Sequence, residues 1–189
     1  MEKKKPALFL DRDGVINQDF GYVSKKENFE FFPEVMEIAL MATEKNWPIV
    51  VITNQSGIGR GLFSEQDFLT LNEWMAEKFQ EYKIEISLVL YAPENPGDEI
   101  DESKLRRKPS PAMFFEAASQ LQLNLGESIM IGDRESDMIA ASNAGVGYRY
   151  LIGENQMNSV ATKVVRNHKE CIKELERFFH HDLGVLENG

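Results

Sequence analysis

The 189-residue sequence predicts an α/β protein with a doubly wound, mostly parallel sheet and helices on both faces. Short apolar runs typical of buried strands alternate with segments of helical periodicity along almost the whole chain. Several of these runs are apolar at successive positions, as strands covered on both faces are. A chain of this length favours one domain over residues 1–189, with no insertion large enough for a separate cap domain.

The first predicted strand, Ala7–Leu10, is followed at once by Asp11, Asp13 and Gly14. Two carboxylates at the end of a buried strand need a cation or hydrogen-bond partners to offset their desolvation. They could share a Mg²⁺ ion, which takes oxygen ligands, and Asp11 could then attack phosphorus to form an aspartyl-phosphate. The alternative is a strand end with a polar turn, because Asp and Gly are common turn residues.

The next segments continue the alternation. Residues 17–32 show no hydrophobic periodicity and predict an irregular flap. Pro33 suits the start of a helix. Trp47–Asn54 predicts a second buried strand, and a glycine-rich loop follows it. Ser64 with Asp67 has the spacing of a capping box for a helix that extends to about residue 82. Residues 84–91 predict a third strand.

The second half of the chain begins with a long charged loop over residues 92–108, and loops of that length are often functional. Pro111 opens the next predicted helix. Ser128–Asp133 predicts a strand that again stops at an aspartate, and a short helix then ends before Gly145. The remaining predicted elements are strands at 147–152 and 163–165 and a helix at 168–180.

Several polar side chains fall where the predicted strands end, namely Asp11, Asp13, Thr53, Asn54 and Asp133. In parallel α/β sheets, ligands bind outside the carboxyl ends of the strands. A doubly wound sheet would therefore bring these side chains together. The glycine-rich loop does not fit a dinucleotide fingerprint, because the position of its third glycine is Leu62.

Composition limits the partners. A net charge of -10 argues against a nucleic-acid backbone or an anionic membrane as main partner. The single cysteine, Cys171, excludes an intramolecular disulfide and a multi-cysteine zinc site. The apolar run at residues 7–10 is too short for a signal sequence or a membrane span. We expect a cytoplasmic monomer that acts on a small molecule.

Four stretches resemble the motifs of the haloacid dehalogenase superfamily of phosphotransferases, in the family's order. They are Leu10–Gly14, Ile52–Gln55, Arg107–Pro109 and Ile131–Asp137. Each stretch alone could be an ordinary strand end, solvated lysine or helix start. Together, on an alternating α/β pattern, they predict an Mg²⁺-dependent phosphatase.

The resemblance implies a role for each motif residue. Asp11 would be the nucleophile, and Asp13 the general acid and then the base. The Asp11 and Asp133 side chains and the Asp13 carbonyl would hold Mg²⁺. Thr53 and Asn54 would bind the phosphoryl oxygens, Lys108 would neutralise their charge, and Asp137 would orient Lys108 or a metal-bound water.

Asp19–Val23 and Thr53–Gly61 resemble the corresponding stretches of the D-glycero-D-manno-heptose 1,7-bisphosphate 7-phosphatases more than those of the related histidinol-phosphate phosphatases. This resemblance implies a sugar-phosphate substrate. Histidinol phosphate or another small phosphate monoester is the alternative, followed by a non-catalytic phosphate-binding role. Arg107 would recognise the second phosphate, a task that suits a guanidinium fork. The implied substrate-binding residues are Arg12, Asp19, Phe20, Gly21, Tyr22, Asn54, Gln55, Ser56, Arg107 and Arg134.

One feature departs from that resemblance. Related phosphatases usually carry a Cys/His zinc loop before Arg-Lys-Pro, and the corresponding positions here are Ala92, Glu94, Lys104 and Arg106. We therefore expect no structural zinc. Our hypothesis is that Glu94 pairs with Lys104 or Arg106 and fixes the loop instead. The three histidines, at 168, 180 and 181, are interpreted as surface or helix-cap residues.

Overall fold

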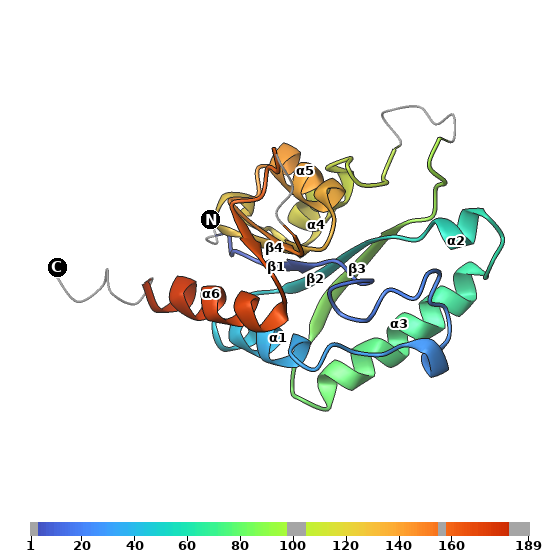
Figure 1. Cartoon of the computed structure of the whole chain (residues 1–189), viewed down its shortest axis with the longest axis horizontal. Coiled ribbons are helices and arrows are strands. Elements are labelled where there is room, and N and C mark those ends of the chain that lie inside the picture. The colour runs from blue at the N-terminus through green and yellow to red at the C-terminus, as the bar shows by residue number, and fades with distance from the viewer. Residues whose placement is uncertain (1–3, 98–104, 155–157, 182–189) are drawn as a thin grey trace.

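The computed structural model describes residues 4–97, 105–154 and 158–181 (Figure 1). Its centre is a parallel sheet with the strand order β3-β2-β1-β4-β5-β6, so the predicted fold class is confirmed. The strands are β1 (Leu8–Leu10), β2 (Ile49–Asn54), β3 (Ile86–Ala92), β4 (Ile129–Gly132), β5 (Tyr148–Ile152) and β6 (Lys163–Val165). β1 lies between β2 and β4, which places its carboxyl end near the centre of the sheet edge.

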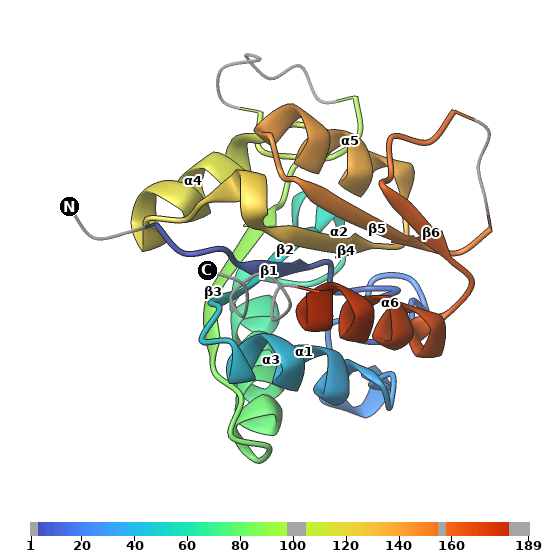
Figure 2. The same ribbon diagram turned by 90° about the vertical axis from the view of Figure 1, so that its left-hand side faces the viewer.

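Helices cover both faces of the sheet, as Figures 1 and 2 show. Because side chains alternate along a strand, Leu8 and Leu10 face one helical layer, and Ala7 and Phe9 face the other. The first layer contains α1 (Val35–Glu44), α3 (Glu65–Gln80) and α6 (His168–His181). The second contains α4 (Ala112–Leu121) and α5 (Glu135–Ala144). Two buried apolar layers thus hold the central strands from both sides.

The predicted helix starts and ends agree with the structure where local signals were strong. Ser64 and Asp67 form the expected capping box, with Ser64 Oγ accepting from the Asp67 N–H at 3.1 Å. α5 ends before Gly145, also as predicted. Two 3₁₀ turns, η1 (Lys26–Asn28) and η3 (Leu125–Glu127), were not predicted.

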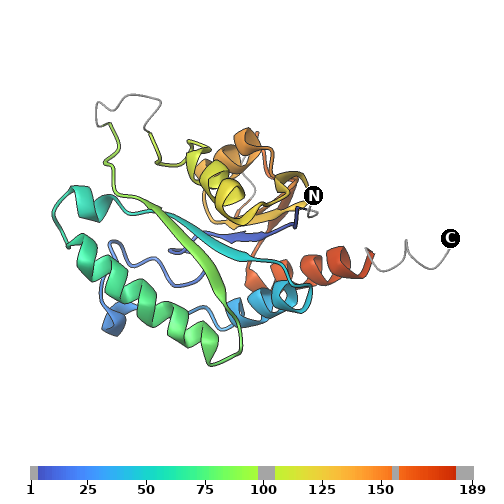
Figure 3. The same cartoon turned by 180° about the vertical axis from the view of Figure 1, so that it is seen from behind.

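The glycine-rich loop contains a one-turn helix, α2 (Ser56–Gly59), that the sequence did not predict. It joins the carboxyl end of β2 to the long helix α3, as seen from behind in Figure 3. A side chain at position 57 would bring its Cβ within 2.1 Å of the Phe63 ring, and one at position 59 would come within 2.5 Å of the Pro93 carbonyl. These glycines therefore serve close packing of the turn.

His168 is neither a surface residue nor the side chain that caps α6, a task that Asn167 Oδ1 performs by accepting the Glu170 N–H, so the prediction for it was wrong. Its side chain is buried at the start of α6, where Nε2 donates to the Val15 carbonyl at 2.8 Å. Its ring also stacks on Phe32, with centroids 4.0 Å apart. The last described helix is thereby attached to the segment that follows Asp11 and Asp13, beyond the end of β1. His180, on the same helix, is exposed as expected.

Acidification should weaken the fold through His168. Burial lowers the pKa of His168 below its usual value, although the Val15 carbonyl and Glu34 act in the opposite direction. Above pH 6.5 the ring is neutral in the folded and unfolded states. As the pH falls from there toward the lowered folded pKa, the unfolded chain takes up a proton that the folded chain does not, so stability is lost.

We expect this loss to be on the order of 1 kcal/mol between pH 7.5 and 5.5. Urea denaturation at several pH values would measure it, and His168→Gln should remove that part of the pH dependence. His180→Gln is the matched control on the exposed face and should change nothing. Parallel loss of stability in wild type and His168→Gln would contradict the assignment.

Candidate active site

The carboxyl ends of β1, β2 and β4 bring the predicted site residues together. Leu10 of β1 is level with Val51 of β2 and Ile131 of β4, so the residues just beyond these strands meet at one edge. A pocket with a volume of about 470 Å³ opens there. The predicted residues that line it are Asp11, Asp13, Asp19, Gly21, Tyr22, Thr53, Asn54, Gln55, Ser56, Arg107, Lys108, Arg134 and Asp137.

Lys108 is buried at the centre of the site. Its Nζ lies 2.9 Å from Asp11 Oδ1 and 2.6 Å from Asp137 Oδ1, and it donates to the Ile52 carbonyl at 2.8 Å. Burial alone would lower the pKa of Lys108, but the charges of Asp11 and Asp137 outweigh burial and raise it. The side chain is therefore an ammonium ion beside Asp11.

The polar atoms of the Asn54 side chain fix the backbone that carries Lys108. Asn54 Nδ2 donates to the Lys108 carbonyl at 3.1 Å, and Asn54 Oδ1 accepts from the Lys108 N–H at 2.9 Å. This pair of bonds joins the end of β2 to a segment more than 50 residues later. The side chain thus has a positioning task that the sequence did not suggest.

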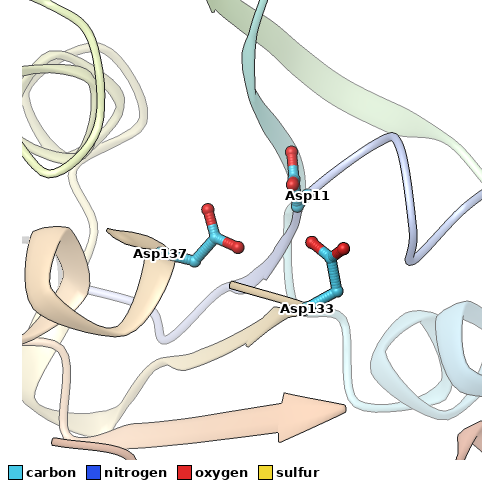
Figure 4. Close-up of side chains that lie close together, drawn as sticks. All are labelled: Asp11, Asp133 and Asp137. Atoms are coloured by element: carbon cyan, nitrogen blue, oxygen red, sulfur yellow. The ribbon is translucent and has the colours of Figure 1, made fainter. Parts of the chain in front are cut away.

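Asp11, Asp133 and Asp137 form a cluster of carboxylates, and one oxygen from each lies within 4.8 Å of the others (Figure 4). Burial raises the pKa of Asp11 to about 8, with Asp137 and Asp133 adding to the shift and Lys108 opposing it. Burial and Asp137 likewise raise the pKa of Asp133 to about 6. Ionised carboxylates this close require more positive charge than Lys108 supplies.

The donor set fits a hard divalent cation. Asp133 Oδ1 is buried and has no hydrogen-bond partner among the described residues. Asp137, in contrast, is held by Lys108 and accepts the Arg134 N–H at 3.0 Å through Oδ2. Gly14, with φ +94°, allows the close approach, since a Cβ there would lie 2.3 Å from Asp133 Oδ2.

The outer part of the pocket is rich in arginine. Arg134 Nη2 forms an ion pair of 2.7 Å with Asp19 Oδ2, and Arg107 Nη1 donates to the Glu94 carbonyl at 3.3 Å. Burial lowers the pKa of Arg107, and nearby Arg134 and Arg60 act in the same direction. Guanidinium groups placed against one another in this way favour an anion between them.

The structure also adds to and corrects the predicted set. Arg60 lines the pocket and its guanidinium lies 5.9 Å from the Tyr22 ring centroid, yet it was not predicted. Its position between two glycines just after a strand end was the available signal. Phe20 is 57% exposed and does not line the pocket. Arg12 is fully buried, bonded to Asp13, and does not line the pocket.

The segment before Arg107 is held by Glu94, and of the two proposed partners Arg106 contributes its backbone N–H and not its guanidinium. Glu94 Oε1 accepts the backbone N–H of Arg106 at 3.2 Å. The Arg106 guanidinium instead pairs with Glu116 Oε2 at 2.8 Å. Lys104, the other proposed partner, lies outside the described residues. A carboxylate-to-backbone bond thus stabilises the segment that presents Arg107.

Comparison with known proteins agrees with this geometry. A HAD-hydrolase-like family model matches residues 105–153. The D-glycero-alpha-D-manno-heptose-1,7-bisphosphate 7-phosphatase of Burkholderia mallei is 43% identical over 89% of this chain and 93% of its own length. The D-glycero-beta-D-manno-heptose-1,7-bisphosphate 7-phosphatase of Vibrio cholerae is 42% identical over 78% of this chain and 81% of its own.

A solved structure shows the same fold. The D,D-heptose 1,7-bisphosphate phosphatase of B. bronchiseptica, complexed with magnesium and phosphate, has a TM-score of 0.78 and 24% identity, and covers 92% of this chain and 99% of that one. Fold, carboxylate cluster and matches define a phosphatase of the haloacid dehalogenase superfamily. Within that class, the chain belongs to the heptose 1,7-bisphosphate 7-phosphatase family.

Proposed function

We propose that this protein removes the 7-phosphate of D-glycero-D-manno-heptose 1,7-bisphosphate through an aspartyl-phosphate on Asp11. The observation that carries the proposal is one pocket with Asp11 and Lys108 at its base and Arg60, Arg107 and Arg134 on its walls. Such a pocket suits a substrate with a reacting phosphate at one end and a second anionic group at the other.

The chemistry follows from the positions of the side chains. The Asp11 contacts among the described residues use Oδ1, which accepts the Arg12 N–H at 2.8 Å and pairs with Lys108. Oδ2 would therefore attack phosphorus while the bond to the ester oxygen breaks. That oxygen keeps the electron pair and takes a proton from Asp13. Asp13 then removes a proton from water, whose oxygen attacks phosphorus and releases phosphate and the Asp11 carboxylate.

Mg²⁺ is part of the proposal. Asp11 and Asp133 would hold the ion through their side chains, and the Asp13 carbonyl, implied by the family resemblance, would be a third ligand. When bound, the ion would supply positive charge to the phosphoryl oxygens beside Lys108. Thr53, which lines the same pocket, would donate its hydroxyl proton to one of these oxygens. No structural zinc is part of the proposal, and Glu94 takes over the fixing of the loop.

We propose a single domain that works as a cytoplasmic monomer on a small sugar phosphate, without nucleic-acid or membrane partners. No helix in residues 4–97, 105–154 and 158–181 has the length and apolar character needed to cross a membrane. Gel filtration would report the oligomeric state directly.

The substrate is tested by Mg²⁺-dependent phosphate release from heptose 1,7-bisphosphate, heptose 7-phosphate and histidinol phosphate. We expect the bisphosphate to have the highest kcat/KM. Arg107→Gln should lower kcat/KM for the bisphosphate about 10- to 100-fold, since a charge-assisted hydrogen bond contributes roughly 1.5–3 kcal/mol. The same variant should change turnover of heptose 7-phosphate little, because that compound lacks the group Arg107 would bind.

A higher kcat/KM for histidinol phosphate than for the heptose bisphosphate would support the mechanism but contradict the proposed substrate. An equal loss with bisphosphate and monophosphate in Arg107→Gln would show that Arg107 acts on the reacting phosphate or on loop order. Glu116→Gln, which removes the partner of Arg106 outside the pocket, is the matched control. It should leave the substrate preference unchanged.

A further inference from the structure

Arg12 is a charged side chain without access to water. It is 0% exposed, and its guanidinium carbon lies 5.4 Å from the centroid of the Phe68 ring and 5.9 Å from that of Phe29. The two rings offer cation–π contact but cannot replace a full hydration shell. A guanidinium buried in this way therefore needs a carboxylate partner to offset the free energy of its desolvation.

The carboxylate is that of Asp13. Arg12 Nε donates to Asp13 Oδ2 at 3.2 Å, and Nη2 donates to Oδ1 at 3.1 Å. Nη2 also donates to the Val23 carbonyl at 2.7 Å, which fixes the guanidinium from its other side. A planar fork that contacts both oxygens determines the plane of the carboxylate, which a single donor cannot do.

Two amides complete the support of Asp13. Gln55 Nε2 donates to Asp13 Oδ2 at 2.9 Å, and Asn17 Nδ2 donates to Oδ1 at 3.0 Å. Gln55 Nε2 also donates to Thr53 Oγ1 at 2.9 Å. Because an amide nitrogen only donates, the Thr53 hydroxyl accepts this bond and keeps its own proton for a phosphoryl oxygen. Asp13 and Thr53 are thus held in one connected network.

We propose that Arg12 is a positioning residue that acts through Asp13 and makes no contact with substrate. The inference rests on the proposed function, in which Asp13 gives a proton to the ester oxygen and later takes one from water. Proton transfer requires heavy atoms about 2.6–3.2 Å apart, and a misplacement of about 1 Å can cost about 100-fold in rate. The two hydrogen bonds from Arg12 prevent the Asp13 carboxylate from rotating out of the position that proton transfer requires.

A double-mutant cycle separates this role from general support of the fold. Arg12→Met keeps an apolar stem between the rings but removes the fork. We expect kcat for the heptose bisphosphate to fall about 100-fold with little change in KM. In an Asp13→Asn background the same substitution should lower kcat no further, since the group through which it acts is already lost.

The leaving group supplies a second readout. p-Nitrophenolate needs no proton to depart, so its release in the first turnover should be nearly the same in Arg12→Met and wild type. Steady-state turnover of p-nitrophenyl phosphate should still fall, because hydrolysis of the aspartyl-phosphate needs Asp13 as base. If Arg12→Met fails to fold, Arg12→Lys keeps the charge without the fork and should show the same pattern at about 10-fold loss.

Three results would overturn the inference. One is a raised KM with unchanged kcat, which would mean contact with substrate. The second is an equal fall, in Arg12→Met, of first-turnover p-nitrophenolate release and of sugar-phosphate turnover. The third is a further fall of kcat when Arg12→Met is added to Asp13→Asn. Either of these two results would mean that Arg12 supports the whole site and does not act through Asp13. If wild type released no phosphate from the heptose bisphosphate, the proposed function itself would be contradicted, and the inference with it.

Discussion

Asp11→Asn should lower turnover by about 10⁴-fold or more, the scale observed when a covalent nucleophile is removed from a hydrolase. Asparagine has nearly the shape of aspartate and can keep the bond from the Arg12 N–H, but its amide cannot attack phosphorus. Because burial raises the pKa of Asp11 to about 8, the site already disfavours charge at this position in the absence of a cation. The neutral variant should therefore fold as the wild type does.

Rapid quenching after mixing with labelled substrate would distinguish Asp11→Asn from Asp13→Asn. Asp11→Asn should yield no phosphoenzyme. Asp13→Asn retains the nucleophile but lacks the base for the second step, so it should accumulate phosphoenzyme with a substrate that has a good leaving group. Phosphoenzyme in Asp11→Asn would place the nucleophile elsewhere and end the proposed mechanism.

The fold could be predicted because its signals are local. Apolar runs of strand length alternate with amphipathic helices, and polar residues stop the strands at Asp11, Asn54 and Asp133. The one-turn helix α2 could not be predicted in the same way. Its four residues include two glycines, which have low helix propensity, and its stability depends on packing against Phe63 and Pro93.

That Asp11 and Lys108 lie together could be predicted for a similar reason, whereas the supporting contacts of the site could not. Asp11 and Lys108 belong to short motifs whose order along the chain is visible. The partner of His168 is 153 residues away, and the burial of Arg12 depends on rings from two other segments. Residue type alone places histidine and arginine at the surface, and only the tertiary structure shows otherwise.

Lys108→Met should reduce both stability and activity. Removing one partner from a buried ion pair costs about 3–5 kcal/mol, and here two carboxylates, Asp11 and Asp137, would lose their shared cation. Loss of a preorganised charge beside the reacting phosphoryl group should also lower kcat about 10²- to 10³-fold. Urea denaturation and steady-state kinetics with Mg²⁺ present would measure the two effects.

The two effects can be separated with a second substitution. Asp137→Asn in the Lys108→Met background removes one of the two uncompensated carboxylates, so stability should recover in part. Activity should not recover, because the ammonium group that lies 2.9 Å from Asp11 is still missing. Recovery of both stability and activity would show that Lys108 serves the fold and not the phosphoryl group. A purely structural lysine would no longer be needed once the Asp137 charge that it neutralises is removed.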